Sequence, residues 1–365
     1  MTIASGIYPP DKGGPAQFAH AFSQWLVSQG ISTTVISLTD GGSRSQTDGL
    51  LELELISRKE NLLFRYIRTA IAIGKRSKGR VLLINGVFLE TLLASFFFPL
   101  KYVAKVPGDI VWERARNQGR TNFNIDDYQG TEDFFKRIMR SLFVRSLNRS
   151  SWILAPSEHM ASLIKSWGVT QSKIRIVRNS VDLSLFSEPK DENEKKYDLL
   201  TVCRLTPWKG VAEVISEAAA RDLSLCVIGS GPELDNLKDH ANKLQAKVTF
   251  LGELEQASIP KYLGQSRCFV LNSAYEGSPH ALLEAMALGS VVIARDSTGT
   301  REVVQDLING ILCGGNRSLG DSLDLVFDSG RELLHLQGAA SKTIQEHYER
   351  NSVFRNILNL LQEIS

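Results

Sequence analysis

The stretch FVLNSAYEGSPHALLEAMALGSVVI, residues 269–293, contains a strand–loop–helix–strand pattern. It begins with a short apolar run, 269–271, that predicts a buried strand. A polar loop follows, and Pro279 favours the start of a helix because proline is tolerated in the first helical turn. The helix is expected to end at Gly289, and the apolar run 291–294 predicts the next strand. This order is typical of a parallel α/β sheet.

Two glutamates lie on either side of the predicted helix start. Glu276 lies in the loop, and Glu284 lies eight positions later, within the helix. Free backbone N–H groups at a helix start suit phosphate or sugar oxygens, and a neighbouring carboxylate is well placed to accept hydrogen bonds from sugar hydroxyls. Taken alone, the two residues favour the ordinary interpretation of a solvated loop acid and an exposed helix acid, and only the surrounding pattern reverses this.

The stretch closely resembles the E-x7-E motif of retaining glycosyltransferases with the GT-B fold, in particular family 4. The usual form, EG-x-P/F-x-x-x-LEAMA-x-G, is matched by Glu276-Gly277, by residues 283–287 and by Gly289. The resemblance implies that Glu276 faces the donor sugar and that Glu284 binds the nucleotide ribose. Further donor contacts are expected from His280, which could equally be a surface residue at the helix start, and from the backbone of Gly277, Ser278, Ala281 and Leu282.

A second motif precedes this stretch. Arg204 and Lys209 follow an apolar run, 199–202, and lie just before a helix expected near Gly210. Two cations at a helix start suit a diphosphate, although isolated surface cations would look the same. The segment resembles the R-x-x-x-x-K-G element with which the family neutralises the donor diphosphate. The sequence GSGPEL at 229–234 is a weak dinucleotide signal and resembles instead the family's G-x-G-P turn.

The first half of the chain opens with a short apolar segment followed by a loop that contains Gly13 and Gly14. Paired glycines allow close backbone approach to a ligand, and the loop resembles the family's N-terminal glycine loop near the donor phosphates. Asp109 follows another predicted strand, in a region where many relatives have a histidine. We therefore expect Asp109 to contact the acceptor hydroxyl, with a surface loop as the alternative, and we class Asp109 and Glu276 as candidate catalytic residues.

The length of 365 residues indicates about two domains. The resemblance implies an α/β GT-B fold with two Rossmann-like domains whose parallel sheets face a central cleft. We expect an acceptor-binding domain at 1–185, onto which a terminal helix at 350–365 packs, and a nucleotide-sugar-binding domain at 186–349. The charged segment 188–196 is the expected linker. The four cysteines lie in or next to apolar runs and predict reduced, buried thiols.

Charge is unevenly distributed along the chain. Residues 1–178 hold 24 Lys and Arg against 14 Asp and Glu, a net charge of +10, whereas residues 179–365 carry −8. The segment 58–80 is expected to be mostly a basic amphipathic helix, either with its apolar side on the sheet or in contact with an anionic membrane. We see no signal peptide, and the apolar run 89–100 is too short to span a bilayer. We expect a cytoplasmic protein, with peripheral membrane contact as the open alternative.

The resemblance implies transfer of a hexose from a nucleoside diphosphate sugar to an acceptor hydroxyl, with retained anomeric configuration. The basic first half favours a lipid-linked or surface-polysaccharide glycan as the acceptor. No D-x-D pair is present, so we expect neither a metal nor a cofactor, and no nucleic-acid partner. A GT-B phosphorylase or epimerase and a non-catalytic scaffold subunit are the alternatives.

Overall fold

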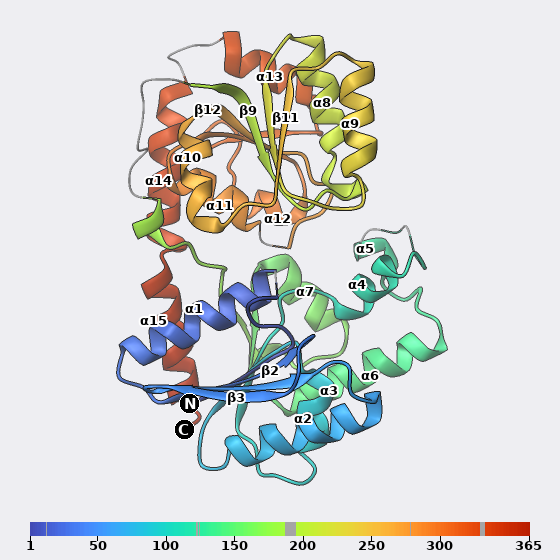
Figure 1. Ribbon diagram of the computed structural model, residues 1–365, viewed down its shortest axis with the longest axis vertical. Helices are drawn as coiled ribbons and strands as arrows, with labels where there is room; N and C mark the ends of the chain where they lie inside the picture. The colour runs from blue at the N-terminus through green and yellow to red at the C-terminus, as the bar shows by residue number, and fades with distance from the viewer. Residues whose placement is uncertain (12, 122, 124, 187–194, 278, 329–332) are drawn as a thin grey trace. The chain divides into compact units, whose positions relative to one another are not determined.

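The computed structural model describes the chain except for residues 12, 122, 124, 187–194, 278 and 329–332 (Figure 1). The chain forms two compact units, Met1–Val177 with Phe354–Ser365, and Arg178–Val353. The boundary expected at 185 lies inside the second unit, and most of the expected linker lies outside the described residues. Both units are α/β with parallel sheets, which confirms the predicted fold class.

The first unit is built on an eight-stranded sheet of order β3-β4-β2-β1-β5-β6-β7-β8. Only the edge strand β3 is antiparallel to its neighbour. All five residues of β3 are exposed, so no buried apolar run marks it in the sequence. The strands are β1 Thr2–Ser5, β2 Thr33–Thr39, β3 Arg44–Asp48, β4 Leu51–Ser57, β5 Leu82–Asn85, β6 Tyr102–Lys105, β7 Trp152–Ala155 and β8 Ile174–Ile176.

Helices cover both faces of this sheet. The chain moves from β1 to β2 in one direction and from β4 through β8 in the other, so right-handed crossovers place α1 on one face and α2, α3 and α6 on the other. Figure 1 shows α2, α3 and α6 next to one another. The helices are α1 Gly14–Ser28, α2 Leu62–Arg76, α3 Phe88–Ala94, α4 Ile110–Asn117, α5 Ile125–Tyr128, α6 Phe134–Arg149 and α7 Glu158–Ser166. The C-terminal α15, Arg350–Gln362, belongs to this unit from Phe354 onward.

The second unit contains a six-stranded, all-parallel sheet of order β11-β10-β9-β12-β13-β14. Its strands are β9 Tyr197–Val202, β10 Leu225–Ile228, β11 Val248–Gly252, β12 Ser266–Leu271, β13 Val291–Arg295 and β14 Ile311–Cys313. Its helices are α8 Val211–Ala220, α9 Leu234–Lys243, α10 Ile259–Gly264, α11 His280–Ala287, α12 Thr298–Arg301, α13 Leu319–Asp328 and α14 Leu334–His347. The predicted strand–loop–helix–strand unit is confirmed as β12, α11 and β13, with β12 and β13 paired in parallel.

Apolar side chains of the second sheet form two buried clusters. Cys226, Cys268 and Cys313 are buried in them, Cys203 is half-buried, and all four cysteines are free thiols. Burial raises the pKa of the Cys226 thiol to about 11 and that of Cys268 to about 12, so these thiols stay protonated at neutral pH. Within the part of the chain that the structure describes, no helix has the length and apolar character needed to cross a bilayer.

Phe354 of α15 completes the core of the first unit beside α1. Its fully buried ring meets the rings of Phe22, Trp25 and Phe18 edge-on, at centroid distances of 5.1, 5.8 and 6.0 Å. The last helix of the chain therefore supplies an aromatic side chain to a cluster that begins near residue 18.

We predict that Phe354→Ala lowers the free energy of unfolding of the first unit by about 3–5 kcal/mol, because it leaves a cavity among three aromatic rings. Urea unfolding followed by circular dichroism gives the loss, and faster hydrogen exchange in α1 localises it. Phe123→Ala makes the same chemical change at an exposed side chain of this unit and serves as the control. Equal urea midpoints for the two variants would contradict the prediction.

Candidate functional site

Asn272, directly after β12, holds together the loops that follow β9 and β12. Its amide nitrogen donates to the Gly210 carbonyl oxygen (3.0 Å) and to Glu213 (2.9 Å), and its amide oxygen accepts from Arg295 (2.8 Å). Gly210 has φ 64°, and a Cβ atom there would lie 2.4 Å from the Asn272 carbonyl oxygen. Glycine is therefore required where the two loops meet.

Lys209 and Glu276 lie side by side where these loops meet. The Lys209 Nζ atom is 2.5 Å from Glu276 Oε1, and the two side chains are only 16% and 12% exposed. A Cβ atom at Gly299 would lie 1.8 Å from the Glu276 carbonyl oxygen, so the glycine of the turn after β13 lets the Glu276 backbone approach. The structure thus joins two residues that the sequence placed in separate motifs.

Arg204 does not take part in this ion pair. Its side chain is exposed, and it forms no ion pair with any described residue. The GSGP turn packs beside its loop, because Cβ atoms at Gly229 and Gly231 would lie 1.9 and 2.2 Å from the carbonyl oxygens of Cys203 and Leu205. These glycines therefore allow close packing of two loops.

The start of α11 presents backbone N–H groups. The helix begins at His280, and its N-cap residue Pro279 makes no side-chain capping bond. Among the described residues, no side chain therefore caps the N–H groups of this first turn, which includes Ala281 and Leu282. His280 is half-buried and engaged in an interaction, Gly277 is half-buried, and Ser278 lies outside the described residues.

Glu284 lies on α11 with only 7% of its surface exposed, so the alternative of an exposed helix acid is wrong. Its Oε1 atom accepts a hydrogen bond of 2.5 Å from Gln256, in a 3₁₀ turn at Gln256–Ser258. Burial raises the pKa of Glu284 to about 7, while the Gln256 bond and the positive charge of Arg350 act in the opposite direction. Gln256 could not be predicted from the sequence, because no local pattern relates it to a residue 28 positions away.

Two buried hydroxyls belong to the same loops. The Oγ atom of Ser273 and the Oγ1 atom of Thr206 are buried and have no hydrogen-bond partner among the described residues. Ser273 follows Asn272, and Thr206 lies between Arg204 and Lys209. Buried polar groups are nearly always paired in proteins, so these hydroxyls suit a ligand or water at this edge of the sheet.

In the first unit, Arg58 braces the loop between β1 and α1. Its guanidinium donates to the Gly6 carbonyl oxygen (2.9 Å) and forms ion pairs with Asp11 (2.6 Å) and Asp40 (3.0 Å). Gly13 has φ 132° and caps α1, which begins at Gly14. Arg58 was expected at the start of the basic helix, but α2 begins only at Leu62.

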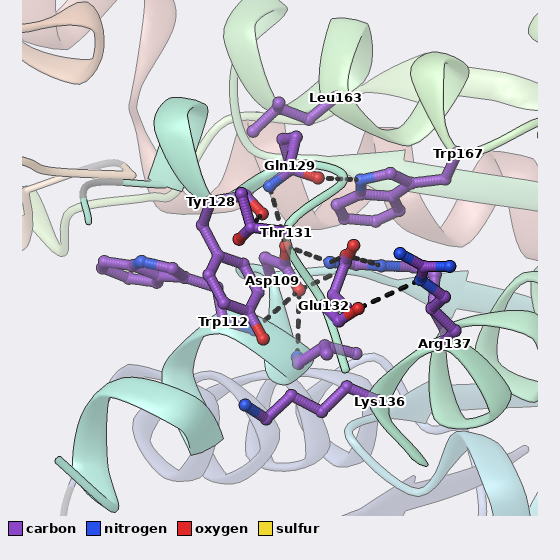
Figure 2. A network of polar contacts seen from close by, with 12 residues as sticks. Asp109, Trp112, Tyr128, Gln129, Thr131, Glu132, Lys136, Arg137, Leu163 and Trp167 are labelled. Atoms are coloured by element: carbon purple, nitrogen blue, oxygen red, sulfur yellow. Dashed lines mark hydrogen bonds and ion pairs between the residues drawn. The ribbon is translucent and has the colours of Figure 1, made fainter. Parts of the chain in front are cut away.

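Asp109 is the centre of a buried polar network (Figure 2). Its Oδ1 atom caps α4 by accepting from the N–H groups of Val111 and Trp112 at 2.9 and 3.2 Å. Arg140 of α6 donates to both carboxylate oxygens, at 2.8 and 2.6 Å, and Gln129 donates to Oδ2 at 3.1 Å. Asp109 has no exposed surface.

The network continues through Arg140 and Gln129. Arg140 also pairs with Glu132 at 3.0 Å and lies 4.4 Å from the ring centroid of Trp167, whose indole N–H donates to Gln129 (2.8 Å). These contacts tie α4, α6 and the end of α7 to the segment around α5 (Figure 2). The geometry gives Asp109 a structural role, and contact with an acceptor hydroxyl would require the network to open.

We predict that Asp109→Asn lowers the free energy of unfolding by about 3 kcal/mol, because it leaves the buried Arg140 with a weakened partner. Thermal and urea unfolding measure the effect, and Asp48→Asn on the exposed strand β3 is the matched control. If Asp109 instead served only the acceptor, the variant would keep its stability and lose only activity.

We predict that the effect of Glu284→Gln on stability depends on pH. With a pKa of about 7 when folded and 4.5 as its ordinary value, Glu284 binds more protons in the folded chain between these pH values. Glu284 therefore lowers stability progressively as pH rises from about 4.5 to about 7. Glutamine stays neutral, so the variant gains relative stability over this range, on the order of 3 kcal/mol at most.

Urea unfolding at several pH values tests this prediction. Glu363→Gln at the exposed C-terminal end corrects for the general loss of a negative charge. A difference between Glu284→Gln and the parent that stays constant from pH 4 to pH 8 would show that Glu284 ionises normally.

Comparison with known proteins bears on the family and the fold of this chain. Residues 184–343 match the model of glycosyl transferases group 1, and residues 121–185 match that of glycosyltransferase family 4. Alpha-monoglucosyldiacylglycerol synthase of Streptococcus pneumoniae is 25% identical over 53% of this chain and 50% of that protein. N,N'-diacetylbacillosaminyl-diphospho-undecaprenol alpha-1,3-N-acetylgalactosaminyltransferase of Campylobacter jejuni is 24% identical over 72% of each chain. The chain spans about half the length of several curated relatives that it matches.

Solved structures share the fold over the whole chain. HepE of Anabaena, in complex with UDP and glucose, superposes with a TM-score of 0.80 over 100% of both chains at 16% identity. Sucrose-phosphate synthase of Thermosynechococcus elongatus gives 0.81 at 15% identity, over 99% of this chain and 98% of that one. The matched family models, relatives and fold agree with the resemblance found in the sequence. This chain has the GT-B fold and belongs to the group 1 glycosyltransferases.

Proposed function

We propose that this protein transfers a hexose from a nucleoside diphosphate sugar to an acceptor hydroxyl, with retention of the anomeric configuration. The observation that carries the proposal is the contact between Lys209 and Glu276 next to the uncapped start of α11. A diphosphate needs cations and N–H donors, a sugar needs hydrogen-bond acceptors, and this edge of the sheet supplies both.

Lys209 and the exposed Arg204 are the proposed ligands of the diphosphate. The leaving diphosphate gains negative charge as the glycosidic bond breaks. Fixed cations therefore stabilise the transition state more than the bound donor, which is the condition for a gain in rate. Glu276 holds Lys209 in place before the donor arrives and then accepts hydrogen bonds from the sugar.

Glu284 is the proposed ligand of the ribose hydroxyls. The Gln256 amide occupies one carboxylate oxygen and so fixes the orientation of the side chain. Backbone N–H groups of Gly277, His280, Ala281 and Leu282 complete the proposed donor site, whereas Ser278, a further expected contact, lies outside the described residues. The glycine loop at Gly13 and Gly14 is the proposed donor contact in the first unit.

The reaction exchanges one bond to the anomeric carbon for another on the same face of the sugar. The bond between this carbon and the phosphate oxygen breaks, and the acceptor oxygen forms the new bond. The acceptor proton passes to the departing phosphate oxygen. This route needs no base from the protein, which is compatible with the burial of Asp109.

We propose a lipid-linked or surface-polysaccharide glycan as the acceptor. Support comes from the names of similar proteins, which include a transferase acting on a diphospho-undecaprenol glycan and an amylovoran biosynthesis glycosyltransferase of Erwinia amylovora. The net charge of +10 over residues 1–178 also favours an anionic acceptor. We further propose that the two cations make a metal unnecessary, and that the protein works in the cytoplasm.

We predict that a nucleoside diphosphate stabilises the protein against heat in the presence of EDTA. A hundredfold excess over the dissociation constant would add about 2.7 kcal/mol. UDP, GDP and their sugars are compared on the parent, Arg204→Ala and Glu284→Ala. Loss of a charged hydrogen bond is worth about 1.5–3 kcal/mol, so each variant should bind roughly 10- to 100-fold more weakly. Lys243→Ala, an exposed cation of α9, should bind like the parent.

The results of this experiment and of the product assays distinguish a transferase from a phosphorylase, an epimerase and a scaffold subunit. Selective stabilisation by one nucleotide, lost in both site variants, identifies the base and justifies an acceptor screen with that donor. Product that requires inorganic phosphate would indicate a phosphorylase, and a changed sugar without an acceptor would indicate an epimerase. No stabilisation by any nucleotide sugar, in a folded protein, would contradict the transferase and favour a scaffold subunit.

A further inference from the structure

Helix α2 turns its large apolar side chains away from the sheet. Its buried side is made mostly of small residues, namely Thr69, Ala70, Ala72, Ile73 and Gly74. The large apolar side chains of its first turns and outer side are 42–70% exposed, namely those of Leu62, Leu63, Phe64, Ile67 and Ile71. The arrangement expected of an ordinary surface helix, with large apolar residues inward and charges outward, is therefore not the one observed.

Helix α6 repeats this arrangement at its first turns. Phe134, Phe135 and Ile138 are 72%, 77% and 43% exposed. Phe96 and Phe97, which follow α3, are 58% and 76% exposed, and the Arg149 guanidinium lies 4.2 Å from the centroid of the Phe96 ring. We call these ten side chains of α2, α6 and the end of α3 the α2–α6 surface.

The members of this surface lie on one face of the first unit. Helix α3 packs against both α2 and α6, and Figure 1 shows the three helices together. Both α2 and α6 precede strands of the parallel part of the sheet, so their first turns lie at the same edge. That edge also carries the loop that ends at Gly13. Monomeric proteins rarely expose so many apolar side chains together, so this surface indicates a binding partner.

Cations accompany the apolar side chains. Neither α2 nor α6 contains an acidic residue. Lys75 and Lys78 near the end of α2, Lys101, and Arg145 on α6 are exposed and form no ion pair with a described residue. Apolar side chains flanked by unpaired cations match the boundary between acyl chains and anionic headgroups.

The charge argues against a second copy of the chain as the partner. A two-fold contact would place the same cations opposite one another, which is unfavourable without counterions. An anionic bilayer instead offers negative charge to the cations and an apolar layer to the phenylalanines. We propose that the first unit docks peripherally on an anionic lipid bilayer through the α2–α6 surface.

Docking would bring the glycine-loop edge of the first unit towards the lipid, where a lipid-linked acceptor resides. The proposal does not depend on the donor or on catalysis, because the surface contains none of the proposed donor-site residues. It differs from the sequence-based expectation in assigning the contact to outward apolar side chains of two helices rather than to one basic helix.

The test is co-sedimentation of the full chain with phosphatidylcholine vesicles that contain or lack phosphatidylglycerol, without nucleotide. The parent should bind the anionic vesicles, less at high salt, and bind neutral vesicles weakly. Phe134→Ser with Phe135→Ser should lower the partition coefficient about tenfold or more. Lys75→Glu with Arg145→Glu should lower it at least about thirtyfold, since each lost cation contributes about fivefold and each new carboxylate is repelled by the anionic surface.

Matched controls lie in the second unit. Ile308→Ser removes an exposed apolar side chain and Lys243→Glu reverses an exposed cation, and both should bind vesicles like the parent. Unchanged melting temperatures show that the surface variants are folded. If they also keep any nucleotide-induced thermal shift of the parent, the loss of vesicle binding is separate from donor binding.

Two results would overturn the proposal. One is that the parent co-sediments equally with anionic and neutral vesicles, or that the surface variants co-sediment with anionic vesicles as well as the parent does. The other is a dimer of the parent in vesicle-free solution that Phe134→Ser with Phe135→Ser dissociates, which would show that a second copy covers the surface. Failure of nucleotide binding would overturn the proposed transferase function and leave the vesicle result valid.

Discussion

The hydrogen bonds of Asn272 are the constraint on which the candidate donor site depends. They fix the loop after β9 against the loop after β12, at a distance that leaves no room for a side chain at residue 210. Lys209 and Glu276 belong to these two loops, so their contact follows from the same geometry. The turn at Gly299 closes against the Glu276 backbone from the other side. Charge and hydrogen-bond donors are thus placed by backbone packing before any ligand binds, which reduces the reorganisation needed during the reaction.

Part of this arrangement could be predicted from the sequence. Apolar runs located β9, β12 and β13, and Pro279 and Gly289 bounded α11 correctly to within a residue or two. The resemblance to a known family then connected Glu276 and Glu284 to a donor sugar. Contacts between distant side chains could not be predicted. Gln256 meets Glu284 across 28 positions and Arg140 meets Asp109 across 31, and no local pattern records either pair. The hydrophobic pattern of α2 identified the helix but not the side that faces the sheet, because the buried residues of this helix are mostly small.

The two units use acidic residues in different ways. In the first unit, Asp109 is fully buried and bonded to a helix start, a guanidinium and an amide, so its oxygens are occupied by the fold. In the second unit, Glu284 is buried with one amide partner and its pKa is raised to about 7, so its affinity for hydrogen-bond donors is only partly used. An acid already saturated by its own protein stabilises the structure, whereas one left short of partners is suited to a ligand.

Helix α15 has a consequence for how the protein is made. Residues 1–177 leave the ribosome first, but Phe354, which covers the rings of Phe22 and Trp25, follows only after the entire second unit has been translated. At a synthesis rate of about 5–20 residues per second, the aromatic side of α1 stays uncovered for roughly ten seconds or more. The first unit therefore begins to be synthesised before the second unit and is completed after it. During this time the nascent chain exposes the apolar side of α1, which must not aggregate before α15 has been translated.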